Sequence, residues 1–465
     1  MQPFDIVVIG SGPAGQRAAI QAAKLGKRVA LIEKQMELGG VCINTGTLPS
    51  KTLREAVLDL SGLRQRGLYG DSYRGKNEVT AADLLWRADL ILKREREVIR
   101  AQLLRNHVNL LEGFGRLAGP NEVAVETPGG IETCRTEFVV IAVGTAPAVP
   151  RGMEADHQIV LTSDDILSLK ALPQRLVVVG GGIIGIEYAT MFAALGIDVT
   201  VIDKRTELLE MVDAEIMAAL RYQSGVLGVT LRLGEEVHGI ERGAQTWVQL
   251  ESGKRISTDM VLISAGRQGA TANLGLETAG IEADARGRIT VDAHYRTSAP
   301  NIYAAGDVIG SPALASTSME QGRLATCHAF GVEARSVPEL FPYGIYAIPE
   351  IAWVGATEAD LTSRGVPFET GVARYREIAR GQIVGDLDGM LKLIFHLDTR
   401  RILGVWIMGT QAAELVHVGQ AVMALDGTLD YFVTGVFNYP TLAECYKVAA
   451  LDGYNKVREA VRAPA

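Results

Sequence analysis

An apolar run that ends in a glycine-rich turn opens the chain: Asp5-Ile6-Val7-Val8-Ile9-Gly10-Ser11-Gly12-Pro13-Ala14-Gly15. The pattern returns as Leu176-Val177-Val178-Val179-Gly180-Gly181-Gly182-Ile183-Ile184-Gly185, and the two copies stay aligned at an offset of 170 residues. A helix pattern and a second strand follow each copy, and an acidic residue, Glu33 or Asp203, lies 18 positions after the third glycine. Strand–helix–strand units that bind dinucleotides have this arrangement. The sequence therefore predicts two Rossmann-like domains that arose by duplication.

Each part of the repeated pattern has a role in binding a dinucleotide. The first glycine permits a tight turn, the second lets backbone approach a pyrophosphate, and the third packs the helix on the strand. Free N–H groups at the helix N-terminus attract the phosphates, and the acidic residue accepts hydrogen bonds from ribose hydroxyls. Two structural crossovers without ligands are the alternative, but the complete doubled pattern favours binding. The residues expected to bind are Gly10, Gly12, Pro13, Ala14, Gly15, Glu33 and Lys34 in the first copy, and Gly180, Gly182, Ile184, Gly185, Asp203, Lys204 and Arg205 in the second.

Composition and charge restrict the class of protein. The chain has 465 residues, too many for one core, and its 54 acidic and 46 basic residues give a net charge of −8. No basic run indicates a nucleic-acid partner, and no apolar stretch reaches the roughly 20 residues of a membrane span. No secretory signal is visible, and the four cysteines form no C-x-x-C pair. We therefore expect a cytoplasmic protein with no nucleic-acid partner, no membrane association and no metal site.

Three further strand-like segments end in small-residue turns. Glu137–Thr145, with Gly144, and Asp259–Arg267, with Gly266, each follow one copy and can return the chain to the ligand of that copy. Asn301–Asp307 belongs to neither copy.

The character of the sequence changes after about Phe341. Alternating segments at 391–396 and 402–407 are typical of antiparallel strands, and helix-period segments follow at 412–425 and 442–457. The whole chain is thus expected to be an α/β protein with a terminal α+β domain. The expected boundaries are 1–150 and 271–340 for the first nucleotide-binding domain, 151–270 for the second and 341–465 for the terminal domain.

Several segments match a known family. They are the two glycine fingerprints, Gly39-Gly40-Val41-Cys42, Pro49-Ser50-Lys51, Ala304-Ala305-Gly306-Asp307 and the terminal domain. Over essentially its full length the chain resembles the flavoprotein disulfide reductases, which include dihydrolipoyl dehydrogenase, glutathione reductase and mercuric reductase. The resemblance implies non-covalent FAD in the first domain, NAD(H) or NADP(H) in the second, and a homodimer or higher homo-oligomer built by the terminal domain. It also implies cofactor contacts from Gly39, Gly40, Val41, Cys42, Gly46, Thr47, Lys51, Gly144, Thr145, Glu187, Gly266, Arg267, Gly306, Asp307, Leu314, Ala315 and Tyr439.

Two positions depart from that family. Disulfide reductases carry C-x-x-x-x-C after the paired glycines, whereas here Thr47 stands five positions after Cys42. A threonine hydroxyl cannot form a disulfide. Where the family has a catalytic histidine before a proline, this chain has Tyr439, and a phenol with a pKa near ~10 is a poor general base. Cys42 is then most simply a small apolar residue beside the flavin, with a thiolate role as the alternative.

One branch of the family shares both departures, namely the soluble FAD-containing pyridine nucleotide transhydrogenases. The segments Thr45–Lys51, Phe437–Thr441 and Gly266–Gly269 resemble that branch. The resemblance implies reversible hydride transfer between NADPH and NAD⁺ through bound FAD, without a redox disulfide. The alternatives are an NAD(P)H diaphorase or dihydrolipoyl-dehydrogenase-like reductase, and a non-catalytic nucleotide-sensing protein.

Lys51 and Glu187 are the candidate catalytic residues. The resemblance implies that the Lys51 ammonium faces the flavin and stabilises it as it becomes anionic. Glu187 should pair with Lys51, because a buried ammonium without a partner would lose its proton. The plainer interpretation is a surface lysine and a solvated glutamate.

The duplication also indicates how one site could accept two cofactors. Asp203 suits the free ribose hydroxyls of NAD(H), but it would repel the 2′-phosphate of NADP(H). Lys204 has a counterpart, Lys34, in the first copy, whereas Arg205 replaces Gln35 and is a new charge. The planar guanidinium suits bidentate phosphate binding, so Arg205 is the predicted phosphate ligand.

Overall fold

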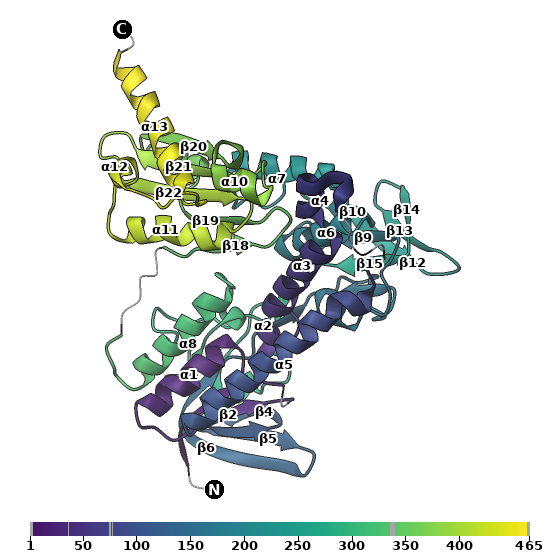
Figure 1. Cartoon of the computed structure of the whole chain (residues 1–465). Helices are drawn as coiled ribbons and strands as arrows, with labels where there is room; N and C mark the ends of the chain where they lie inside the picture. The colour runs from purple at the N-terminus through teal and green to yellow at the C-terminus, as the bar shows by residue number, and fades with distance from the viewer. Residues whose placement is uncertain (1–2, 36, 74–75, 77, 335–339, 463–465) are drawn as a thin grey trace. The chain divides into compact units, whose positions relative to one another are not determined.

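The computed structural model describes residues 3–35, 37–73, 76, 78–334 and 340–462 (Figure 1). The chain divides into two compact units. The first comprises Met1–Leu53, Ala81–Ala171 and Ala265–Ser336, and the second comprises Arg54–Thr80, Leu172–Ser264 and Val337–Ala465. No helix among the described residues is long and apolar enough to cross a membrane.

A parallel sheet forms the centre of the first unit. Its strands lie in the order β3 (Asn109–Glu112), β2 (Val29–Glu33), β1 (Phe4–Ile9), β6 (Gly130–Ile141) and β17 (Ile302–Ala304). Strand β17 is the segment that the sequence assigned to neither copy, and it pairs with the carboxyl half of β6. Apolar side chains on both faces of β1 are buried, as expected for a parallel sheet covered on both sides.

Strand β6 continues beyond this sheet. Its amino half pairs antiparallel with β5 (Glu122–Thr127), which pairs in turn with β4 (Phe114–Gly119). Two short strands, β7 (Thr145–Pro147) and β16 (Arg267–Gly269), form a separate antiparallel pair. A further short strand, β8, spans Val160–Thr162.

Helices pack on the first sheet through small residues. Helix α1 (Pro13–Lys24) runs side by side with α8 (Ala315–Ala329), and alanines of both helices are buried between them (Figure 1). Helix α5 (Ala81–Arg105) buries Leu92, Ile99 and Leu103 in the same core. The short helix α2 (Gly40–Asn44) and the start of α3 (Thr47–Ser61) follow the paired glycines.

A second parallel sheet belongs to the second unit. It contains β11 (Thr230–Leu233), β10 (Asp198–Asp203), β9 (Arg175–Val179) and β15 (Met260–Ile263), in that order. Helix α6 (Ile183–Ala194) follows β9 and is apolar on nearly all sides, which is typical of a helix enclosed by other elements. The other elements here are α4 (Leu63–Tyr69), α7 (Ala214–Val226), β12 (Val237–Glu241), β13 (Thr246–Leu250) and β14 (Arg255–Thr258).

The carboxyl-terminal part of the second unit is an antiparallel sheet with helices. Its strands lie in the order β18 (Tyr343–Ile345), β19 (Ile351–Gly355), β22 (Ile402–Met408), β21 (Met390–His396) and β20 (Phe368–Arg374). The helices are α9 (Glu358–Ser363), α10 (Ala379–Val384), α11 (Ala412–Ala424), α12 (Leu429–Thr434) and α13 (Glu444–Arg462). The predicted α/β fold, with two Rossmann-like sheets and a terminal α+β domain, is confirmed.

Candidate functional site

The first glycine fingerprint requires glycine for two different steric reasons. Gly10 has a φ of +102°, and a Cβ there would lie 2.4 Å from the carbonyl oxygen of Ala142. At Gly15 a Cβ would lie 1.9 Å from the carbonyl oxygen of Gly10, so any side chain would push α1 away from β1. These two glycines therefore fix how closely the helix approaches the strand.

Gly12 is different, because nothing in the protein requires glycine there. Its φ of −64° is ordinary, and a Cβ would meet no protein atom within 4 Å. The space that a side chain would fill lies in front of the N-terminus of α1, where free N–H groups attract anions. A pyrophosphate fits this space, and only glycine leaves it open.

A cavity of about 380 Å³ surrounds this turn and lies wholly within the first unit. Most residues predicted for the first site line it, namely Gly10, Gly12, Pro13, Ala14, Glu33, Lys34, Gly40, Val41, Cys42, Thr47, Gly144, Thr145, Gly306, Asp307 and Ala315. Gly15, Gly39, Gly46, Lys51 and Leu314 are not among its lining residues. The sequence did not identify Phe114, Gly115 or Ser318, which also line it, because no motif marks them. Thr45 lines it too, and it belongs to the matching segment Thr45–Lys51, but no cofactor contact was predicted for it.

Thr45 adds a second indication that the cavity holds a ligand. Its Oγ1 is buried and has no hydrogen-bond partner among the described residues. Buried polar groups are nearly always hydrogen-bonded, so this hydroxyl can gain a partner from a molecule in the cavity. With the open space at Gly12, this arrangement fits a dinucleotide.

Glu33 is held in place by a short network. Its Oε2 accepts hydrogen bonds from the backbone N of Ser11 at 3.0 Å and from Ser11 Oγ at 2.6 Å. Ser11 Oγ in turn accepts a hydrogen bond from the backbone N of Gly39. Hydrogen bonds therefore link Glu33, the residue predicted to bind the ribose, to the fingerprint turn at Ser11, and link Ser11 to Gly39 of the paired glycines.

Asp307 is a buried carboxyl group in the cavity wall. Burial raises the pKa of Asp307, and a hydrogen bond from Ser318 Oγ and the charge of Arg267 only partly oppose this effect. The backbone N of Gly306 donates to Gln321 Oε1. These contacts hold the turn after β17 against α8.

Cys42 and Thr47 lie together where disulfide reductases carry two thiols. Burial raises the pKa of the Cys42 thiol, although a hydrogen bond with Thr47 opposes the shift. The thiol is therefore protonated at neutral pH, and its partner is a hydroxyl. The remaining cysteines, Cys134, Cys327 and Cys445, are buried elsewhere and unpaired.

The two predicted catalytic residues lie in different units. Lys51 is partly buried near the start of α3, and its Nζ donates to Ser50 Oγ at 3.3 Å. Glu187 is buried in α6, and its Oε1 accepts a hydrogen bond from the backbone N of Tyr346 at 2.8 Å. The proposed pairing of Lys51 with Glu187 stays a prediction.

The second fingerprint repeats the geometry of the first. Gly180 has a φ of +103°, and a Cβ on Gly185 would lie 1.9 Å from the Gly180 carbonyl oxygen. Gly182 again has open space around its missing side chain. Helix α6 begins within this fingerprint, and Ile184 lies in its first turn.

Asp203 follows this fingerprint at the carboxyl end of β10, where it is 6% exposed. Burial would raise the pKa of Asp203, but hydrogen bonds from Arg205 and from Gly181 N outweigh it, and the pKa lies below its ordinary value. Lys204 turns to the surface beside Glu236, with 3.7 Å between Nζ and Oε1.

Arg267 and Tyr439 occupy contrasting positions. The Arg267 side chain donates to both Thr145 Oγ1 and Thr145 O at 2.8 Å, and it contacts Asp164 at 3.3 Å. It therefore secures β16, next to Gly266, against β7. Tyr439 is 69% exposed on the second unit. A cofactor contact by either residue stays a prediction.

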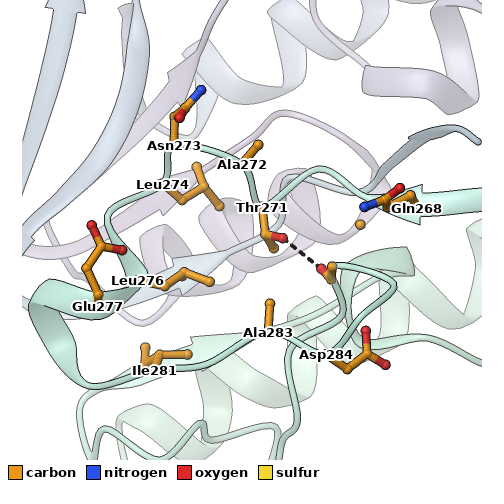
Figure 2. A pocket seen from close by; sticks show the side chains of 12 residues that line it. Gln268, Thr271, Ala272, Asn273, Leu274, Leu276, Glu277, Ile281, Ala283 and Asp284 are labelled. Carbon is orange, nitrogen blue, oxygen red and sulfur yellow. Dashed lines mark hydrogen bonds between the residues drawn. The ribbon is translucent and has the colours of Figure 1, made fainter.

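A second cavity, of about 360 Å³, lies on the segment that follows Arg267 (Figure 2). Leu274, Leu276 and Ile281 supply apolar walls, and Thr271 Oγ1 donates to the carbonyl oxygen of Gly287 at 2.9 Å. The fingerprint residues do not line it. We assign it no role.

Comparisons with known proteins agree with this geometry. Residues 4–322 match the pyridine nucleotide-disulphide oxidoreductase family, and residues 341–450 match its dimerisation domain. Soluble pyridine nucleotide transhydrogenases are 55% identical in Mycobacterium bovis and 41% identical in Escherichia coli, each match covering 98% of both chains.

Solved structures show the same likeness. The flavoprotein disulfide reductase RclA from Escherichia coli, in its Cu(II) complex, is similar at a TM-score of 0.88 and 28% identity, over 97% of this chain and 99% of that one. LpdA from Mycobacterium tuberculosis is similar at a TM-score of 0.88 and 27% identity, over 96% and 98%. The chain therefore belongs to the pyridine nucleotide-disulphide oxidoreductase family.

Proposed function

We propose that this chain is a soluble transhydrogenase that transfers a hydride reversibly between NADPH and NAD⁺ through bound FAD, without a redox disulfide. The observation that carries the proposal is the pair Cys42 and Thr47, a thiol hydrogen-bonded to a hydroxyl where disulfide reductases have two thiols, in a chain that retains both dinucleotide fingerprints. Relatives that are 41–55% identical over the whole chain bear the transhydrogenase name, which supports the same function.

The first unit would hold FAD. The turn at Gly12 and the N-terminus of α1 would bind its pyrophosphate, and Glu33 would bind the adenosine ribose. Asp307, in the turn after β17, would bind the remaining part of the cofactor in the same cavity. A bound flavin accepts a hydride from a reduced nicotinamide and can return it to an oxidised one.

The second unit would bind the two nicotinamide cofactors in turn. The turn at Gly182 leaves room for a pyrophosphate, as Gly12 does. Asp203 and Arg205 would distinguish the ribose hydroxyls of NAD(H) from the 2′-phosphate of NADP(H). Lys51 would place a positive charge where negative charge develops, and Glu187 would keep that lysine protonated.

The terminal domain would make the enzyme a homodimer, since residues 341–450 match a dimerisation domain. Tyr439 lies on the exposed surface of this domain and could contact the partner's cofactor in such an assembly. We place the enzyme in the cytoplasm, because its four free cysteines suit a reducing compartment.

Steady-state transfer tests the proposal directly. Purified FAD-loaded protein is mixed with NADPH and thio-NAD⁺, and the reduced thio-nucleotide is followed by its own absorbance. We expect transfer with ping-pong kinetics, because NADP⁺ leaves before the second nucleotide binds. Lipoamide and glutathione disulfide serve as control acceptors and should receive no electrons, because the second thiol is absent.

The same assay separates the alternatives. Fast reduction of quinones or dyes without transfer to thio-NAD⁺ would identify a diaphorase. NADPH-dependent reduction of a disulfide would show that Cys42 acts without the expected partner. No electron transfer to any acceptor by FAD-loaded protein would favour a nucleotide sensor.

A further inference from the structure

Arg205 folds back onto Asp203 and occupies the carboxylate. Its Nε donates to Oδ1 at 3.0 Å, its guanidinium NH2 donates to Oδ2 at 2.7 Å, and its backbone N donates to Oδ1 at 2.8 Å. The backbone N of Gly181 adds a fourth hydrogen bond, to Oδ2, at 2.7 Å. Each oxygen therefore accepts two hydrogen bonds, and a carboxylate has about four lone-pair positions. As the side chains stand, Asp203 has no acceptor position left for a ribose.

The two side-chain bonds are the ones that can be released. If the Arg205 guanidinium swings away, the backbone bonds from Gly181 and Arg205 remain, one on each oxygen. One lone pair per oxygen then becomes available, which matches the two vicinal hydroxyls of an NAD(H) ribose. The guanidinium thus occupies the same acceptor positions that this ribose needs.

The first copy of the duplicated unit lacks this arrangement. There Ser11 supplies both recorded hydrogen bonds to Glu33, and both go to Oε2. Gln35 stands at the position equivalent to Arg205 and carries no charge. The arginine is therefore present only in the copy that, under the proposed function, must accept two different nucleotides.

Exposure also favours a mobile arginine over a fixed one. The Arg205 side chain is 43% exposed, whereas that of Asp203 is 6% exposed. The guanidinium is therefore the partner that can turn into solvent, although its bidentate geometry makes the bond stronger than an ordinary surface ion pair. The carboxylate stays in place because backbone groups hold it.

We propose that Arg205 is a latch on Asp203 that sets cofactor selection in opposite directions for the two nucleotides. NAD(H) must displace the guanidinium before its ribose can bind Asp203. NADP(H) instead binds the Arg205 guanidinium through its 2′-phosphate. As long as the guanidinium is also hydrogen-bonded to Asp203, it neutralises the carboxylate that would repel that phosphate. This inference rests on the proposed use of both nucleotides. It adds that Arg205 weakens the binding of NAD(H) to Asp203, and that Asp203 weakens the binding of NADP(H) to Arg205.

Calorimetric titration of the oxidised FAD-loaded protein with NAD⁺ and NADP⁺ tests the latch, since neither nucleotide reduces the flavin. In Arg205→Ala, NADP⁺ should bind roughly ten- to hundredfold more weakly through loss of a charge-assisted hydrogen bond. NAD⁺ should bind at least about twofold more tightly, because the guanidinium no longer competes for the Asp203 carboxylate. In Asp203→Asn, NAD⁺ should bind more weakly and NADP⁺ no more weakly than in the wild type.

Arg221→Ala is the matched control. Arg221 is 44% exposed, much as Arg205 is at 43%, and lies 3.6 Å from Glu207 in the same unit, so the variant removes an equally exposed arginine without freeing a buried carboxylate. Both nucleotides should bind this variant as they bind the wild type. FAD content and thermal unfolding are measured for every variant to verify that it is folded.

The outcomes separate the latch from the proposed function. Unchanged or weaker NAD⁺ binding in Arg205→Ala overturns the latch, even where hydride transfer remains intact. A wild-type protein that binds only one nucleotide overturns both the latch and the transhydrogenase assignment. Tighter NAD⁺ together with weaker NADP⁺ in Arg205→Ala supports the latch, whichever electron acceptor the enzyme proves to use.

Discussion

Gly322 of α8 lies directly against Ala14 of α1, and a Cβ on Gly322 would sit 2.0 Å from the Ala14 carbonyl oxygen. The contact joins two helices that are far apart in the sequence, and Ala14 lines the dinucleotide cavity. The position of α8 therefore sets the position of the α1 N-terminus, where the pyrophosphate would bind. A change at Gly322 should act on both stability and cofactor binding.

We expect Gly322→Ala to lower the free energy of unfolding by about 1–3 kcal/mol, the usual effect of overpacking, and to reduce the FAD content. Thermal unfolding and the ratio of flavin to protein absorbance measure the two effects. Gly225→Ala is the control, because Gly225 lies in α7 with no atom within 4 Å of the added Cβ. It should be neutral or stabilising by up to ~1 kcal/mol. Wild-type stability in Gly322→Ala would contradict the packing argument.

The absorption spectrum of the reduced enzyme should show that the redox disulfide is absent. Burial raises the pKa of the Cys42 thiol, so under the proposed function no thiolate would lie beside the flavin at neutral pH. Anaerobic two-electron reduction should therefore yield reduced FAD without a long-wavelength thiolate-to-flavin charge-transfer band. Cys42→Ser should give the same spectrum as the wild type. A band that appears in the wild type and disappears in Cys42→Ser would show that Cys42 has the thiolate role.

Lys51→Met tests the proposed electrostatic residue. The variant should keep FAD, because the pyrophosphate would be held at Gly12 and the helix N-terminus. Reduction by NADPH should slow by roughly 10²–10³, as removal of one preorganised donor typically does. Stopped-flow measurement at the flavin absorbance band gives the rate, and Lys51→Arg should recover part of it. A wild-type rate in Lys51→Met would remove the residue from the mechanism.

Asp307→Asn should separate stability from function. Burial raises the pKa of Asp307, so folding favours its protonated form. The apoprotein therefore loses stability as the pH rises from the ordinary aspartate pKa through the raised one. The asparagine variant should lack this loss and be more stable as apoprotein at pH 7, by about 0.5–2 kcal/mol, but bind FAD more weakly. Denaturant melts at pH 4 and pH 7 give the difference. An apoprotein that is less stable than the wild type at pH 7 would refute the argument.

The repeated fingerprints allowed the sequence to predict the backbone around both nucleotide sites. Gly10 and Gly15 need glycine for reasons internal to the fold, so their spacing after an apolar run predicts a strand, a turn and a helix. The terminal strands β21 and β22 were also predictable, in their case from alternating apolar residues. The segments predicted at 391–396 and 402–407 were found at Met390–His396 and Ile402–Met408.

Side-chain pairings could not be predicted in the same way. Arg205 and Asp203 are two residues apart in a turn, and no periodicity determines which way the guanidinium points. Arg267 and Thr145 are separated by 122 residues, and only the tertiary fold brings β16 to β7. Phe114 and Gly115 reach the first cavity from β4, a strand that no motif identifies.

The replacement at Thr47 also bears on chemical vulnerability. Trivalent arsenic compounds and similar thiophilic metals bind tightly when two neighbouring thiols can chelate them. Here Cys42 is the most accessible of the four cysteines, and its neighbour is a hydroxyl, while Cys134, Cys327 and Cys445 are buried. This protein can therefore bind such compounds with only one thiol at this position, whereas its disulfide-reducing relatives can bind them with two. Its electron transfer should therefore continue at arsenite concentrations that stop those relatives.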